Sequence, residues 1–107
     1  MALNLAVSSI SAFNNIGTSP IQVAPANSAR NQILFHNPGT VDIFVAPVIV
    51  FLGGVNANLN PSTSLLGGCF RIFANGGDRI ITGNCLMAWQ AFSASASNNP
   101  LTVMELS

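Results

Sequence analysis

The chain has 107 residues, enough for one domain with a single core, and its formal net charge is zero. Charged residues make up 6% of it, against about 25% in an ordinary globular domain, while hydrophobic residues make up 50%. This balance argues against intrinsic disorder. The chain has no lysine and three arginines, so it lacks the clustered basic residues that nucleic-acid binding requires.

A membrane role is not expected either. The most apolar run, residues 41–52, is too short to span a bilayer and is interrupted by Asp42 and Pro47. The first 17 residues show no basic segment and no long apolar core, so we predict no signal peptide. We therefore expect a protein made in a cytoplasm and kept there, or carried in or on a particle assembled there.

The turn residues of this sequence predict an all-β fold. Glycine pairs and prolines separate short runs rich in Ile, Val, Phe and Leu, and no run has a helical period. Strands are predicted near residues 20–24, 32–37, 41–46, 48–52, 68–74, 79–82, 85–93 and 101–106. Seven to eight short strands indicate an antiparallel β-sandwich, jelly-roll-like, or a small barrel. Residues 1–18 are expected to form an N-terminal arm or edge strand, and residues 19–107 the β-sandwich domain.

Residues Asn37, Pro38 and Gly39 form a predicted turn between two apolar strands. Pro38 fixes φ at the second turn position, and Gly39 suits the positive φ that a type II turn needs next. We expect a hairpin here, with the alternating residues Ile33, Phe35, Val41, Ile43 and Val45 on one face.

Several predicted strands are apolar on both faces, although a sandwich buries only one face of each sheet. The second face is expected to contact a partner, which predicts a homo-oligomer, most simply a trimer. The candidate interface residues are Leu3, Leu5, Val7, Phe44 and Trp89. The uncharged loop 53–66 is either a binding loop or an ordinary surface loop.

Catalytic or metal chemistry finds little support in the sequence. His36 is the only histidine, the carboxylates are Asp42, Asp78 and Glu105, and no catalytic motif surrounds them. We expect no enzyme activity and no cofactor. Cys69 and Cys85 with one histidine fall short of a structural zinc site. They are either buried thiols, the default in a reducing compartment, or a disulfide if their strands are neighbours.

Three segments form a distinctive series of strands and turns: APANSARNQILFHNPGTVDIFVAP (24–47), GGCFRIFANGGDRI (67–80) and LMAWQAFSASASNNPLTVMELS (86–107). The series runs from Arg30 through Ile-Leu-Phe-His-Asn-Pro-Gly at 33–39 and Ala-Trp-Gln-Ala at 88–91 to Leu-Thr-Val-Met-Glu at 101–105. It resembles small virion proteins of tailed bacteriophages. Residues 1–18 and the loop 53–66 match nothing in that pattern.

The resemblance implies a β-sandwich that decorates or completes a phage particle, often as a symmetric oligomer. The expected function is a non-enzymatic capsid decoration or cement subunit in the virion, binding copies of itself and the major capsid protein or another virion protein. A tail, collar or head–tail joining component is the alternative, and a carbohydrate-binding module is a further one.

Overall fold

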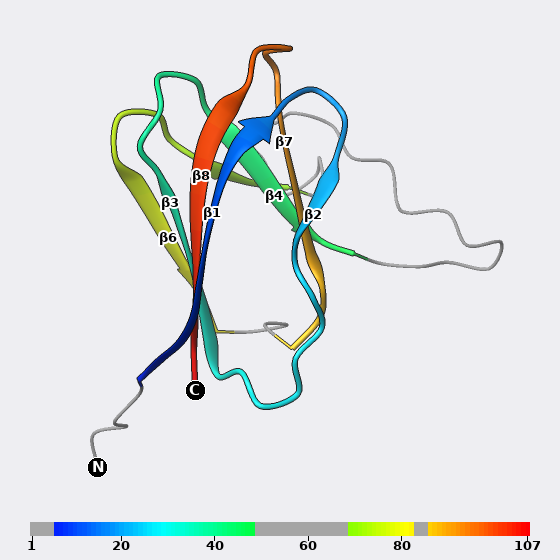
Figure 1. The fold of residues 1–107 in the computed structure, drawn as a ribbon, viewed down its shortest axis with the longest axis vertical. Coiled ribbons are helices and arrows are strands. Elements are labelled where there is room, and N and C mark those ends of the chain that lie inside the picture. Colours follow the sequence, from blue (N-terminus) through cyan, green and yellow to red (C-terminus); the bar gives the residue numbers. More distant parts are fainter. Residues whose placement is uncertain (1–5, 49–68, 83–85) are drawn as a thin grey trace, which may run out of the picture.

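Two four-stranded antiparallel sheets pack face to face in this chain (Figure 1). The computed structural model describes residues 6–48, 69–82 and 86–107, and these residues contain eight strands. The strands are β1 (Val7–Ile16), β2 (Ile21–Ala24), β3 (Gln32–Asn37), β4 (Ile43–Pro47), β5 (Phe70–Ile72), β6 (Gly77–Ile81), β7 (Trp89–Ser93) and β8 (Asn99–Leu106). Sheet A has the order β1-β8-β3-β6, and sheet B has the order β2-β7-β4-β5.

The order of the strands is that of a jelly roll. The first strand pairs with the last and the third with the sixth in sheet A, while β2 pairs with β7 and β4 with β5 in sheet B. The first half of the chain thus pairs antiparallel with the second half as one long ribbon of four strand pairs. The ribbon is rolled so that successive strand pairs lie in opposite sheets. The predicted fold class is confirmed.

The core lies between the sheets and is built by side chains that alternate along each strand. In β3 and β8 every second residue is buried and the others are half-buried. Trp89 sits at the centre of this core, with its ring centroid 5.4 Å from that of Phe35 and 6.1 Å from that of Phe70. Both sheets therefore contribute aromatic side chains to one apolar layer.

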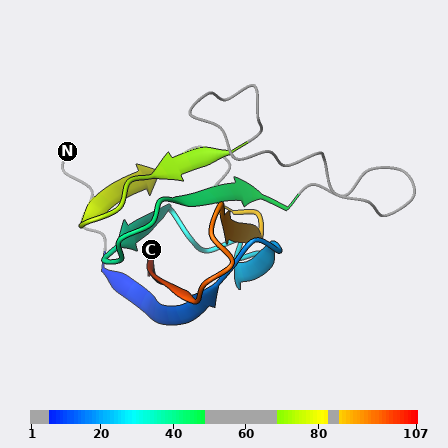
Figure 2. The ribbon, with the colours of Figure 1, turned by 90° about the horizontal axis from the view of Figure 1, so that it is seen from above.

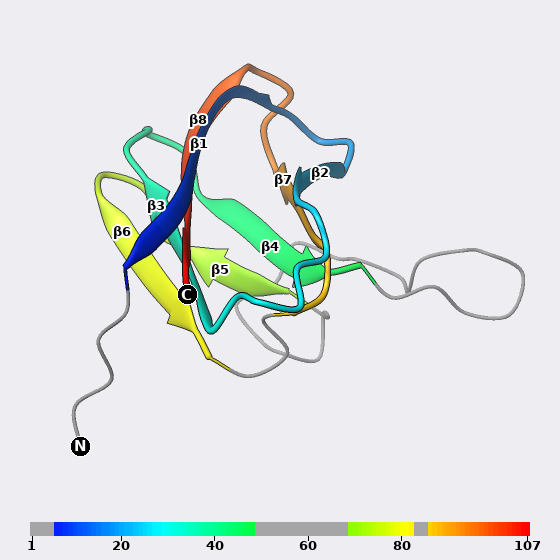
Figure 3. The same cartoon turned by 60° about the horizontal axis from the view of Figure 1, so that its bottom comes forward.

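The expected hairpin at residues 37–39 is wrong. β3 belongs to sheet A and β4 to sheet B, because both edges of β3 are already occupied, by β8 and β6. Figure 3 shows β3 beside β6 and β4 beside β5. The chain crosses between the sheets at this corner, so Ile33 and Phe35 reach the core from one sheet and Ile43 and Val45 from the other.

The expected type II turn is also wrong, because Gly39 does not have a positive φ; among the described glycines only Gly76 does, at 95°. Gly39 is required for space instead. A Cβ at this position would lie 2.8 Å from Cδ and 2.9 Å from Cγ of Pro100. Asn37, which is fully buried, fixes the corner: its Nδ2 donates to the carbonyls of Val41 and Ile72, and its Oδ1 accepts from the N–H of Gly39.

The strands β4 and β7 are buried on both faces within the chain, although their second face was expected to contact a partner. One face joins the main core. On the other face Phe44, Ala46, Cys69 and Phe92 form a second buried cluster, in which the rings of Phe44 and Phe92 stack with centroids 5.7 Å apart. The outward side chains of these two strands are therefore covered within the chain itself.

Candidate interaction surface

The outer face of sheet A carries a row of apolar side chains that crosses all four strands. Ile10 of β1 lies opposite Met104 of β8, Met104 opposite Leu34 of β3, and Leu34 opposite Ile80 of β6. Residues directly opposite in an antiparallel pair share a face. Ile10 and Ile80, at the two ends, are 61% and 56% exposed. We call these four residues the apolar row.

The two rows of residues that flank the apolar row differ in polarity. Toward one end of the strands, Leu106 lies between Val7, which is 50% exposed, and the polar residue Gln32 of β3. Toward the other end, Thr102 lies opposite Ala12 and His36, and His36 lies opposite Asp78. The outer face of sheet A therefore has an apolar centre and one polar margin, as many protein–protein contact surfaces do.

The histidine of that margin is within hydrogen-bonding range of Asp78, through Nδ1 of the ring and Oδ1 of the carboxylate. The two side chains are 37% and 58% exposed, and the third residue in line with them is Thr102. A hydrolytic site would need Thr102 or a serine activated by His36 in a place shielded from water. This row lies on an open sheet face, where water competes for each group, so we treat the pair as part of the polar margin.

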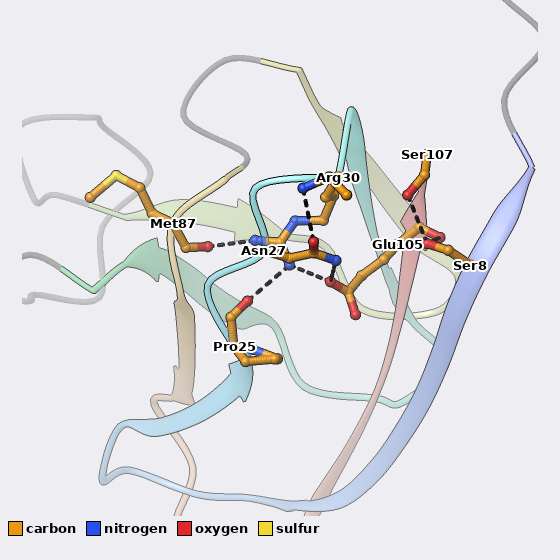
Figure 4. A network of polar contacts seen from close by, with 8 residues as sticks. Ser8, Pro25, Asn27, Arg30, Met87, Glu105 and Ser107 are labelled. Atoms are coloured by element: carbon orange, nitrogen blue, oxygen red, sulfur yellow. Dashed lines mark hydrogen bonds and ion pairs between the residues drawn. The ribbon is translucent and has the colours of Figure 1, made fainter.

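Two of the three side-chain carboxylates, Glu105 and Asp42, form ion pairs with arginines, and Asp78 contacts His36. The most buried pair joins Arg30 to Glu105 at one end of the sandwich (Figure 4). Arg30 is 1% exposed; it also donates to the carbonyls of Pro25, at 3.0 Å, and Met87. Arg30 thus connects the loop before β3 with the end of β8 in sheet A and with the segment leading to β7 in sheet B.

The local sequence around Arg30 holds this arrangement in place. The side chain of Asn27 accepts from the N–H of Ala29 and donates to Oε1 of Glu105 at 3.4 Å. Burial raises the pKa of Glu105, but the hydrogen bonds from Arg30 and Asn27 and the charge of Arg30 outweigh that effect, so the pKa lies below its ordinary value. Glu105 is therefore an ionised structural group, and the sequence motif containing Arg30 has a structural role.

A second structural pair fixes the turn between β5 and β6. Oδ2 of Asp42 accepts from Nε of Arg71 at 2.7 Å, and Oδ1 accepts from the N–H of Ala74 at 2.8 Å. The hydrogen bond from the N–H of Ala74 is the largest cause that lowers the pKa of Asp42, and the hydrogen bond and charge of Arg71 lower it further. Burial raises this pKa, but by less than the Ala74 bond lowers it. The guanidinium of Arg71 in turn lies 4.7 Å from the ring centroid of Phe73. Because Arg71 and Ala74 both hold the carboxylate of Asp42, this group orders the turn and is not available as a general base.

The structure distributes the predicted site residues differently from the sequence interpretation. Trp89 and Phe44, both expected at an interface, are 1% and 6% exposed, because the core and the second cluster enclose them. Val7 remains on the surface. Asn37, Pro38 and Gly39 form the corner described above, and Cys69 is buried in the second cluster. Leu3, Leu5, Cys85 and the loop 53–66 lie outside the described residues.

Sequence reasoning missed the apolar row as a unit. The placement of Leu34 and His36 opposite the core face follows from alternation alone. The row, however, depends on a register that brings residues 10, 34, 80 and 104 into one line, and no local pattern contains that register.

Comparisons with protein-family models, with curated proteins and with solved structures give no match for this chain. Among the described residues, no helix has the length and apolar character to cross a membrane. In the same part of the chain, no group of three or more His, Cys, Asp or Glu side chains is placed to hold a metal ion.

Proposed function

We propose that this protein is a non-enzymatic structural subunit of a tailed-phage particle, which binds the assembled capsid as a decoration or cement protein and acts as a homo-oligomer. The observation that carries the proposal is the apolar row on the outer face of sheet A. The phage assignment itself rests on the sequence resemblance, and the surface supports the general role of a subunit that is covered by protein neighbours.

The chemistry of the outer face of sheet A favours a protein partner held by apolar contacts. Fully burying an isoleucine or methionine side chain contributes about 1.5–3 kcal/mol, and two members of the apolar row are more than half exposed. The only charged groups in line with this face, His36 and Asp78, already neutralise each other when the histidine is protonated. Attraction between opposite charges therefore contributes little to the binding of a partner at this face.

The main test is the retention of the protein on purified particles of the phage that encodes it. Raising the salt concentration from about 0.05 to 1 M shortens the Debye length to about 3 Å. We expect the protein to stay bound across this range and to be released by urea or guanidinium, which weaken apolar burial. Release by sodium chloride alone would contradict attachment through the apolar row.

The copy number on the particle separates the proposal from its alternative. A decoration protein covers the shell and is present in hundreds of copies, whereas a tail, collar or head–tail joining component is present in far fewer. Quantitative mass spectrometry against the major capsid protein measures this ratio. A copy number of a dozen or fewer would replace the decoration role with a connector role, and absence from the particle would reject both.

A further inference from the structure

Of the four edge strands in the part of the chain that the structure describes, three are protected against pairing with another chain. β2 has four residues and lies between Pro20 and Pro25, and β5 has only three residues. β6 carries two exposed charged residues, Asp78 and Arg79. Short strands, prolines and charges are the devices by which natural sheets prevent edge-to-edge association.

The fourth edge strand, β1, has none of these three devices; bulges are a further one, and its two register shifts lie toward its ends. Its ten residues, VSSISAFNNI, include no charge and no proline. Its pairing with β8 has two register shifts, between Val7 and Ser9 and between Phe13 and Ile16, so the segment 9–13 between them is regular. In Figure 2, β1 (blue) runs along the outside of the molecule, with no ribbon of described residues beyond it.

The hydrogen bonds at the end of β8 show which backbone groups of β1 face outward. Ser107 exchanges two backbone hydrogen bonds with Ala6, while the carbonyl of Leu106 accepts from Asn31 on the opposite side. Backbone groups alternate along a strand, so Glu105, Val103 and Leu101 turn toward β1 and bond their partners Ser9, Ser11 and Phe13. The N–H and C=O groups of Ile10 and Ala12 consequently point to the open edge.

We propose that β1 pairs antiparallel with β1 of a second copy of the chain, about a two-fold axis at Ser11. Ile10 of each copy then exchanges backbone hydrogen bonds with Ala12 of the other, and the two copies of Ser11 face each other at the axis. The two sheets A become one continuous sheet, and the two apolar rows lie on the same side of it.

A second copy fits this edge better than another partner does because of the residues at the axis. In a two-fold contact each residue near the axis meets its own copy or a close neighbour, so a charged residue there would meet a like charge. β1 has none. The pairing also sets a large residue against a small one, Ile10 against Ala12 on the outer face and Phe13 against Ser9 on the inner face.

The contact closes as a dimer, because each copy has one β1 edge and the two-fold axis uses both. It therefore differs from the trimer expected from the sequence. It concerns the purified chain alone and does not depend on the phage assignment. A dimer that is absent from phage particles would support this contact and reject the phage assignment, whereas a monomer retained on phage particles would reject this contact and keep that assignment.

The test is analytical ultracentrifugation of the full chain at about 1–50 μM, the range in which a small interface gives measurable dissociation. We expect a dimer of twice the 11.1 kDa chain mass. Ile10→Lys should raise the dimer dissociation constant at least tenfold. Ile80→Lys is the matched control, because it changes the same residue type at similar exposure on the same face but at the protected edge. It should leave the dimer intact.

A cysteine placed at the axis tests the register without relying on the lysine variants. Ser11→Cys should form a disulfide-linked dimer under mild oxidation, since Cα atoms of opposed antiparallel residues lie within disulfide range. Ser28→Cys, in an exposed turn, should not. A wild-type monomer, a trimer, or a dimer that neither responds to Ile10→Lys nor cross-links through Ser11→Cys would overturn the proposal.

Discussion

Arg30 is the residue whose loss we expect to cost the most stability. Removing it leaves Glu105 and the carbonyls of Pro25 and Met87 without their buried donor. Deleting one partner of a buried ion pair typically costs about 3–5 kcal/mol, so we expect a loss of that size for Arg30→Ala in urea unfolding. Arg79→Ala removes an exposed arginine whose contact here is the ring of Phe70, and it should cost less than about 1 kcal/mol.

A double variant distinguishes two causes of the stability loss in Arg30→Ala: a buried charge on Glu105 without its partner, and lost packing. If the cost of Arg30→Ala comes from leaving Glu105 ionised and buried, Arg30→Met combined with Glu105→Leu should recover a large part of it. The recovery should be incomplete because two backbone carbonyls still lack a donor. A double variant as unstable as Arg30→Ala would instead assign the loss to the loop before β3.

Gly39 tests whether space or backbone conformation selects a glycine at the corner between the sheets. We expect Gly39→Ala to destabilise the fold by about 1–3 kcal/mol, the usual cost of overpacking, because the new Cβ meets the ring of Pro100. Shortening that ring with Pro100→Ala should then restore part of the loss in a double-mutant cycle. Purely additive effects of the two substitutions would contradict the steric explanation.

At the scale of strands and turns, two carboxylates each connect a strand region with a neighbouring turn or loop. Asp42, next to β4, holds the β5–β6 turn, and Glu105, in β8, holds the loop before β3. Both pKa values are lowered in the folded state, so each carboxylate adds stability above its unfolded pKa of about 4. That stability is lost as the pH falls through the lower folded pKa.

We therefore expect the free energy of unfolding to be flat with respect to these two groups above about pH 5 and to decrease below about pH 4. Urea unfolding between pH 2.5 and 7 measures this dependence. Asp42→Asn and Glu105→Gln should each lower stability at pH 7 and make the acid limb shallower. An acid limb unchanged in both variants would mean that other groups determine the pH dependence.

The sequence was sufficient for most strands and insufficient for their partners. β3 begins and ends where alternation predicts, and the apolar sequences of β4 and β7 predicted their burial on both faces. The sequence alone did not show that Phe44 on the second face of β4 is buried in a cluster with Phe92 and Cys69 of the same chain, because these contacts join residues far apart in sequence. The hairpin after β3 was mispredicted for the same reason: the edge of β3 with which β4 would have paired is paired with β6 instead.

β1 was hard to predict because it is an edge strand. Two of its residues on the core side of the sheet, Ser9 and Ser11, are serines, and they weaken the alternation of apolar and polar residues that marks a strand. Its end nevertheless joins the core through Ile16, which is fully buried. Deleting residues 1–17 would therefore remove part of the core together with any contact made by the N-terminus, and substitutions on the surface of β1 are the cleaner test.

At the scale of the whole molecule, the asymmetry between the two sheets determines which face is available to a partner. The outward apolar side chains of β4 and β7 in sheet B are buried in the second cluster, whereas sheet A leaves the apolar row on its surface. The few charges serve mainly as internal connections at the ends of the strands. A nearly uncharged surface is consistent with a chain that is normally covered, because zero net charge gives no self-repulsion to keep free copies apart.

This asymmetry gives a direct prediction for binding to the particle. We expect Ile80→Lys to reduce the retention of the protein on purified particles by at least about tenfold, because burying a lysine in an apolar contact costs more than about 1.4 kcal/mol. Leu86→Lys is the matched control: Leu86 is 48% exposed but lies outside the strands of sheet A, in the segment before β7, where its carbonyl accepts from the N–H of Asn27. Both variants should melt near the wild-type temperature, since both positions are on the surface.

The same pair of variants distinguishes attachment through sheet A from attachment elsewhere. Ile80→Lys is expected to keep the β1 contact between copies, so a lost particle signal with an intact dimer would place the particle contact on the apolar row. Equal retention of Ile80→Lys and Leu86→Lys would remove the outer face of sheet A from the interface. Loss of retention in Leu86→Lys alone would move the contact to the end of the sandwich where Arg30 joins the two sheets.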